Sequence, residues 1–176
     1  MRSRLVLSAA LAVMLAGCAG TPDSRYYTLS AAPPQGGNVT AGNGYRLAAV
    51  HLPSLYDRPE LVFRNGPNSV DFAEFDRWAE PLERMAGRIL AEDMALRYPQ
   101  APIGPARLQV TIDDFMADRS GVVFLSGTWQ LSGSGDQQSH SGRFSLSQPV
   151  SGLDGDKVAG AMSVLLGRLA DDLGRI

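Results

Sequence analysis

Cysteine is almost absent from this chain: Cys18 is the only one in 176 residues. A single thiol cannot form an intramolecular disulfide, and it cannot supply the several ligands of a cysteine-based metal site. The chain beyond residue 17 must therefore be stabilised by burial of apolar side chains. It is long enough for one domain with a complete hydrophobic core.

A basic surface is also lacking. The formal net charge is −2 at pH 7, and the sequence pI is near 5.6. Domains that bind nucleic acids are usually basic, because Lys and Arg side chains neutralise the phosphates. We therefore expect no nucleic-acid partner, and the charge gives no reason to expect a second, electrostatic contact with a membrane.

Recognisable catalytic motifs are missing. The two histidines, His51 and His140, do not form an HExxH pair, and there is no Gly-x-Ser-x-Gly elbow or glycine-rich phosphate loop. The adjacent aspartates at 113–114 and 171–172 would point apart on a strand or a helix. The sequence predicts no catalytic residues, metal ligands or cofactor. An envelope hydrolase is the weakest alternative, since it needs a histidine within hydrogen-bonding reach of a Ser or Asp.

Long hydrophobic runs are limited to one segment near the N-terminus. Residues 5–15 carry no charge and follow Arg2 and Arg4. The run is only about half of the roughly 20 apolar residues that a membrane-spanning helix needs. Basic residues followed by a short apolar run are typical of a signal peptide, which we assign to residues 1–17.

The apolar run ends in Leu15-Ala16-Gly17-Cys18, which resembles the lipobox of bacterial lipoproteins. The resemblance implies that Cys18 becomes the lipidated N-terminus with three acyl chains. At about 0.8 kcal/mol per buried methylene group, two or more chains anchor a protein stably. Ala19 follows in place of aspartate, which in lipoproteins of enterobacterial type implies export to the outer membrane. The alternatives are an ordinary signal peptide with a chance cysteine, or a buried core segment.

Composition divides the rest of the chain into a tether and a domain. Residues 18–44 are rich in Gly, Pro, Ala and Ser, which is typical of a lipid-anchored tether. Within them, Arg25-Tyr26-Tyr27-Thr28-Leu29 is a dense run of β-formers, so we expect a short first strand near residues 25–30 that pairs with the domain. A single domain is assigned to residues 45–176.

The domain alternates between the periods of strands and helices. Strands are expected at 45–52, in a hairpin whose Asn65-Gly66 supplies positive φ angles, and in a meander of three antiparallel strands from about 108 to 150. Amphipathic helices are expected from Trp78 to about residue 96, and over 158–173. This order predicts an α+β two-layer sandwich, a mostly antiparallel sheet with two amphipathic helices on one face.

The helix ends and surfaces can also be predicted. For the first helix, Asp76 is a plausible N-cap, and Pro81 is tolerated only in the first turn. Acid–base pairs at i,i+4, such as Asp93–Arg97, indicate its solvated face. Trp78 at its head is either a core anchor or a contact with a partner. Asp154 or Asp156 is expected to cap the second helix.

Several segments, taken in order, resemble the PqiC family, which is the auxiliary lipoprotein component of certain ABC-type transporters. The lipobox is followed by Tyr26-Tyr27-Thr28-Leu29, then by a segment containing Leu52-Pro53 and Asp57-Arg58. The most recognisable part is Arg77-Trp78-Ala79-Glu80-Pro81-Leu82. One departure is Leu55-Tyr56, which reverses the family's usual order of tyrosine then leucine.

The resemblance implies a partner rather than a reaction. Members of this family accompany MCE-domain proteins, which are anchored in the inner membrane and form tubes that carry lipid across the periplasm. The lipoprotein would sit in the outer membrane, face the periplasm and dock the far end of the tube, with a homo-oligomeric ring as one arrangement. The candidate contact residues are Tyr56, Arg58, Arg77 and Trp78. The alternative is a periplasmic module that binds lipid or another small ligand in an apolar cavity between the layers.

Overall fold

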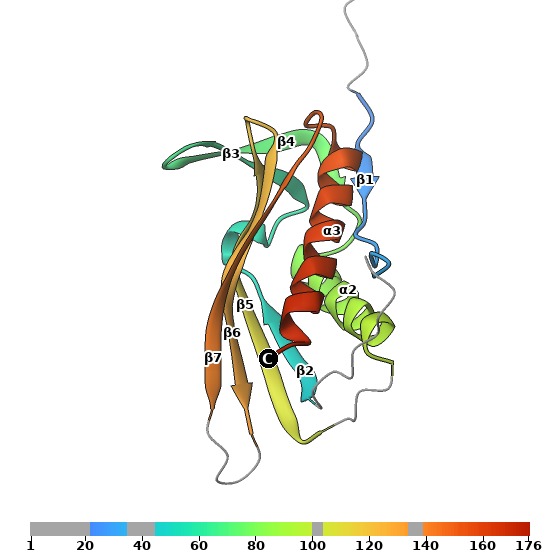
Figure 1. Ribbon diagram of the computed structural model, residues 1–176. Helices are drawn as coiled ribbons and strands as arrows, with labels where there is room; N and C mark the ends of the chain where they lie inside the picture. The colour runs from blue at the N-terminus through green and yellow to red at the C-terminus, as the bar shows by residue number, and fades with distance from the viewer. Residues whose placement is uncertain (1–21, 35–44, 100–103, 134–138) are drawn as a thin grey trace, which may run out of the picture.

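The computed structural model describes residues 22–34, 45–99, 104–133 and 139–176 (Figure 1). The predicted signal peptide, Cys18, and residues 19–21 and 35–44 of the predicted tether lie outside the described residues. The elements in chain order are β1 (Arg25–Tyr27), β2 (Tyr45–His51), the short 3-10 helix η2 (Ser54–Tyr56), β3 (Glu60–Gly66), β4 (Ser69–Trp78), α2 (Leu82–Arg97), β5 (Ala106–Asp118), β6 (Val122–Ser132), β7 (His140–Pro149) and α3 (Gly155–Leu173).

Within the described residues, seven strands form one mixed sheet in the order β1-β4-β3-β5-β6-β7, with β2 beside β5. The long pairings β5–β6 and β6–β7 are antiparallel, as is the β3–β4 hairpin. The shorter pairings β1–β4, β2–β5 and β3–β5 are parallel. Both helices cover the same face of the sheet (Figure 1). The predicted α+β sandwich and its three-stranded meander are confirmed.

A β-bulge in β5 keeps the core continuous along this long strand. Leu108, Val110 and Ile112 face the helices, and the register with β6 then shifts between Ile112 and Asp114. The extra residue switches the inward-facing side chains from even-numbered to odd-numbered positions, so that Phe115 and Ala117 point inward. All five side chains are at most 1 % exposed. Without the bulge, the second half of β5 would turn its apolar side chains away from the helices.

Helix α3 forms as the sequence predicts. The Asp154 side chain caps it by accepting a hydrogen bond of 3.1 Å from the backbone N–H of Lys157. Its apolar stripe is buried against the sheet and against α2, and comprises Val158, Met162, Leu165, Leu166, Leu169 and Leu173. No helix within the described residues is both long enough and apolar enough to cross a membrane.

The predicted start of the first helix is wrong. Helix α2 begins at Leu82, and Trp78 is the last residue of β4. The Trp78 backbone N–H donates to the Pro59 carbonyl at 2.6 Å, which holds this segment in the sheet. Pro81 stands at the N-cap position in an extended conformation rather than in the first turn. Asp76, the predicted cap, instead lies in β4 and binds Arg25.

The hairpin is present, but its turn differs from the prediction. Gly66 pairs with Ser69, so Pro67 and Asn68 are the central residues. Neither Asn65 nor Gly66 has a positive φ; among the described residues only Gly121 and Gly152 do. The ring of Pro67 fixes φ near −65°, which suits the first central position of an ordinary turn.

Candidate functional site

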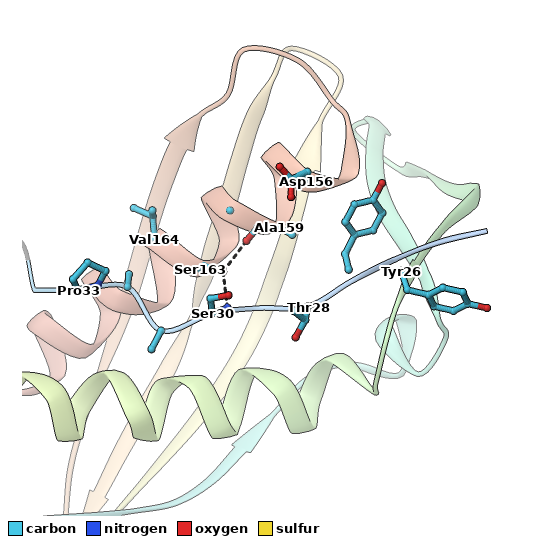
Figure 2. Close-up of a pocket in the computed structure, with 12 residues that line it drawn as sticks. Tyr26, Thr28, Ser30, Pro33, Asp156, Ala159, Ser163 and Val164 are labelled. Atoms are coloured by element: carbon cyan, nitrogen blue, oxygen red, sulfur yellow. Dashed lines mark hydrogen bonds between the residues drawn. The ribbon is translucent and has the colours of Figure 1, made fainter. Parts of the chain in front are cut away.

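The N-terminal part of the described chain runs between the two helices (Figure 2). We call residues 28–33 the strap. Leu29 is 2 % exposed and belongs to the hydrophobic core. The backbone N–H of Ser30 donates to Ser163 Oγ on α3 at 3.1 Å, and the backbone N–H of Leu29 contacts the Met85 sulfur on α2 at 3.4 Å. The strap is therefore packed into the body of the protein.

Strand β1 fastens the chain just before the strap. Arg25 binds the Asp76 carboxylate with two hydrogen bonds, of 2.6 and 3.0 Å, and Tyr27 donates to the same carboxylate at 3.1 Å. The Tyr27 ring lies against Gly155, where a Cβ atom would come within 2.4 Å of it. Glycine at the start of α3 therefore lets β1 approach the helix closely.

A buried ion pair on α2 holds the far end of the strap. Asp93 Oδ1 accepts from the Ala32 backbone N–H at 2.9 Å, and Arg97 Nη1 donates to the Ala32 carbonyl at 2.9 Å. The two side chains bind each other at 2.9 Å, and Arg97 Nε also donates to Asp171 on α3 at 2.7 Å. We call Asp93 and Arg97 the clamp. It satisfies both polar backbone groups of Ala32 in the way that a neighbouring strand would.

The clamp corrects the prediction that this pair marks a solvated face. Asp93 is 0 % exposed and Arg97 is 4 % exposed. Burial raises the pKa of Asp93, although the adjacent Arg97 acts in the opposite direction. The sequence does contain a signal for this position: Asp93 and Arg97 continue the four-residue spacing of Met85 and Ile89, so they fall on the buried stripe of α2.

A shallow groove of about 500 Å³ lies between the strap and the outward side of α3. On the α3 side, Ala159, Gly160 and Ser163 have small side chains, so the strap and helix can approach each other. Ser163 bridges the two by accepting from Ser30 and donating to the Ala159 carbonyl at 2.8 Å. Tyr26 and Asp156 border the groove at one end, as Figure 2 shows.

Two of the predicted contact residues are buried. Tyr56 is 4 % exposed, and its hydroxyl oxygen accepts a hydrogen bond of 2.8 Å from the Phe115 backbone N–H. Burial raises the pKa of Tyr56 to about 12. Trp78 is 5 % exposed and packs in the core. Neither side chain is available on the surface, so the core alternative holds for Trp78.

The other two predicted residues lie near the surface of the β3–β4 hairpin. Arg58 is exposed and stacks on Phe72, with its guanidinium carbon 3.8 Å from the ring centroid. Arg77 lies opposite Glu60 at the base of the same hairpin, with a nitrogen–oxygen distance of 4.0 Å. Phe72 is 41 % exposed and was not predicted, because an apolar residue in a strand is more often part of the core.

The two histidines do not converge. Both are exposed; His51 ends β2 and His140 begins β7. Strands β5 and β6 lie between them, and three strand spacings of about 4.8 Å amount to roughly 14 Å across the sheet. The register places His140 level with Leu47 rather than with His51, so the two histidines are also offset along the strands. Among the described residues, no group of three or more His, Cys, Asp or Glu side chains could hold a metal ion.

Comparisons with known sequences give a consistent result. The family model for the ABC-type transport auxiliary lipoprotein component matches residues 27–174. The chain is 30 % identical over 146 residues to the intermembrane transport lipoprotein PqiC of Escherichia coli strain K12. This match covers 77 % of this chain and 76 % of the relative. The corresponding lipoprotein of Shigella flexneri matches to the same extent.

Two solved structures share the fold. One is a crystal structure of an uncharacterised protein, with a TM-score of 0.73 and 19 % identity; the match covers 88 % of this chain and 98 % of that one. The other is a Xanthomonas campestris protein, with a TM-score of 0.66 and 20 % identity, covering 85 % of this chain and 92 % of that one. At these identities the similarity concerns the fold alone.

Proposed function

This chain belongs to the family of ABC-type transport auxiliary lipoprotein components, and from this we propose that it is a docking subunit of an intermembrane lipid transport system, anchored in the outer membrane and facing the periplasm. Membership in the family gives a transport auxiliary role, which suggests a protein that does not catalyse a reaction. In this proposal the lipidated Cys18 anchors the chain in the membrane, and the partner is an MCE-domain protein that is fixed in the inner membrane.

The fastening of the strap is the observation that carries this proposal. Because β1 and the strap are fixed to the body, the chain is fastened at Arg25, and the seven residue steps from Cys18 to Arg25 span at most about 25 Å. A loose tether from Cys18 to Tyr45 would reach about 90 Å instead. The body is therefore held close to the membrane, which suits a subunit that presents a docking site at a defined height.

The Arg58–Phe72 pair supports a protein partner. Arginine and aromatic side chains are enriched at the energetic centres of protein interfaces. Both side chains are exposed and already ordered by stacking. Phe72 lies on β4 of the β3–β4 hairpin, whose turn projects from the body (Figure 1), and Arg58 lies just before β3. Arg77, at the base of the hairpin, is the second candidate contact.

We also propose that identical copies of this chain assemble into a ring that docks the partner. Within the described part of the chain, β7 pairs only with β6, so its outer side is a ten-residue sheet edge. Such edges can pair with another chain. Arg168 covers one point of this edge by donating to the Ser147 carbonyl at 2.9 Å. Light scattering of the detergent-solubilised lipoprotein should give a multiple of the monomer mass.

The structure offers less support for a ligand-binding module. Such a module needs an enclosed apolar cavity between the sheet and the helices. The groove beside the strap opens on the outward side of α3. A smaller hollow of about 310 Å³ lies where Lys157 and Ala161 of α3 approach Gln148–Ser151. Neither of these two hollows lies between the layers.

The proposal is tested by capturing the partner. The full lipidated chain with an affinity tag is extracted in mild detergent, and the retained proteins are identified by mass spectrometry. We expect an MCE-domain protein to be retained, and we expect Cys18→Ala to leave the chain unanchored in the soluble fraction. If no MCE-domain protein is recovered with the anchored chain, the docking function is contradicted.

A further inference from the structure

The short reach of the anchor limits which surface can touch the membrane. Arg25 is fastened to the body through Asp76, and the seven residue steps from Cys18 to Arg25 span at most about 25 Å. The next residue, Tyr26, is 64 % exposed. Figure 1 shows β1 at one end of the molecule, away from the C-terminal end of α3. The surface around β1 is therefore the one nearest to the anchor.

Tyr26 and Tyr27 point in opposite directions, as neighbours on a strand must. The Tyr27 hydroxyl binds Asp76, and its ring packs on α3 at Gly155. The Tyr26 ring points away from the helices (Figure 2). Exposed tyrosine is favoured at the boundary between lipid and water, because the ring is apolar and the hydroxyl can remain hydrated.

The groove beside the strap continues this surface. Beyond Tyr26 it is lined mainly by small or apolar groups, among them Ala31, Ala32, Pro33, Ala159 and Val164. Apart from Asp156 at its border, a surface of this kind can lie against lipid headgroups with little burial of unpaired polar side chains.

The charges nearby favour a neutral lipid surface. Arg25 is paired with Asp76, and Lys157 is paired with Asp154 at 2.9 Å. The carboxylate of Asp156 is exposed and borders the groove. Arg77, the β4 neighbour of Tyr26, lies 4.0 Å from Glu60, so each of these three cations has a carboxylate partner. Together with the Asp156 carboxylate at the groove, this arrangement disfavours contact with an anionic membrane surface.

We infer that Tyr26 and the groove between the strap and α3 form a contact surface for the headgroup layer of a zwitterionic phospholipid membrane. This inference rests on the proposed lipid anchor at Cys18, and it adds a second, non-covalent contact that sets the orientation of the body. Tyr26 lies at the boundary of the acyl chains, and the side of α3 that borders the groove faces the membrane.

Quenching by brominated lipid tests this contact. The full lipidated chain is placed in phosphatidylcholine vesicles with brominated acyl chains, as Tyr26→Trp and, for comparison, as Leu96→Trp. Leu96 is the matched control, since it is 50 % exposed and lies near the end of α2. The native Trp78 and Trp129 give the same background in both variants. We expect bromine to quench most of the emission added at position 26 and little of that added at position 96.

Each outcome decides a separate point. Emission at position 26 that is unquenched, or quenched no more than at position 96, overturns the membrane contact. Quenching at position 26 that requires added anionic lipid overturns its zwitterionic character. If the wild-type chain does not float with the vesicles, the proposed anchor fails and the inference fails with it. Flotation without quenching at position 26 overturns the inference alone.

Discussion

Asp93 and Arg97 lie one turn apart on α2, and their ion pair is buried and holds both polar backbone groups of Ala32. The pair therefore acts on a segment that is 61 residues away in the sequence. An ion pair of this kind is costly to desolvate, and the hydrogen bonds to Ala32 and Asp171 offset part of that cost. The clamp thus couples the stability of the helix pair to the position of the strap.

Removing one partner of the clamp should be strongly destabilising. Arg97→Ala leaves the Asp93 carboxylate buried without its cation, and we expect it to lower the free energy of unfolding by about 3–5 kcal/mol. Urea denaturation of the domain measures this. Arg88→Ala is the control, because Arg88 pairs with Glu80 on the surface, where a loss below about 1 kcal/mol is expected. Equal losses in the two variants would show that the clamp is not buried in solution.

The strap should contribute to stability through Leu29. Its side chain is 2 % exposed, so Leu29→Ala leaves a cavity in the core, and we expect a loss of about 2–5 kcal/mol. The control is Tyr26→Ala, three residues away and 64 % exposed, with an expected effect within about 0.5 kcal/mol. Thermal denaturation compares the two. A strap that behaved as a free tether would make both substitutions neutral.

Tyr56 should make stability depend on alkaline pH. Burial raises its pKa to about 12, from an ordinary value of 10.0. Between these values the folded state binds more protons than the unfolded state, so this contribution is complete below pH 10 and is lost as pH rises toward 12. The slope is at most about 1.4 kcal/mol per pH unit.

The variant Tyr56→Phe isolates this contribution. At neutral pH it should cost about 1–3 kcal/mol, because the Phe115 N–H loses its acceptor in the core. Because phenylalanine does not ionise, the difference in unfolding free energy between wild type and variant should shrink from pH 10 to pH 12. Urea denaturation at a series of pH values gives both curves. A difference that stays constant over this range contradicts a raised pKa at Tyr56.

Much of the fold is predictable because it depends on local periodicity. The inward alternation of Leu108, Val110 and Ile112 and the apolar stripe of α3 are visible in the sequence, and both are confirmed. Trp78 is different, since its spacing from Leu82 and Met85 fits a helix equally well. The pairing of Trp78 with Tyr27 of β1 and its hydrogen bond to Pro59 hold it in the sheet, and such long-range pairing overrides local pattern. The parallel pairings and the bulge beside Asp113 leave no periodic signal either.

The candidate site was harder to predict, because it depends on which side chains point outward. Tyr56 and Arg58 are two positions apart in a tight turn, yet the first is buried and the second is exposed. A three-residue 3-10 helix has no periodicity from which that difference could be read. In the clamp, the i,i+4 spacing of Asp93 and Arg97 is the same as for a surface pair, and the signal for burial is their position on the stripe that begins with Met85 and Ile89.

The last prediction concerns the Arg58–Phe72 pair as a contact with the partner. Stacking at an exposed site contributes only about 0.5–1 kcal/mol, so Phe72→Ala should leave the fold intact. If the pair is central to the interface, its truncation costs about 1–2 kcal/mol of binding, or roughly a five- to thirtyfold loss of captured MCE-domain protein. Leu96→Ala is the matched control, because Leu96 is similarly exposed but lies on α2. Equal capture by the two variants would exclude the hairpin, since both remove an exposed apolar side chain and only one removes the stacked pair.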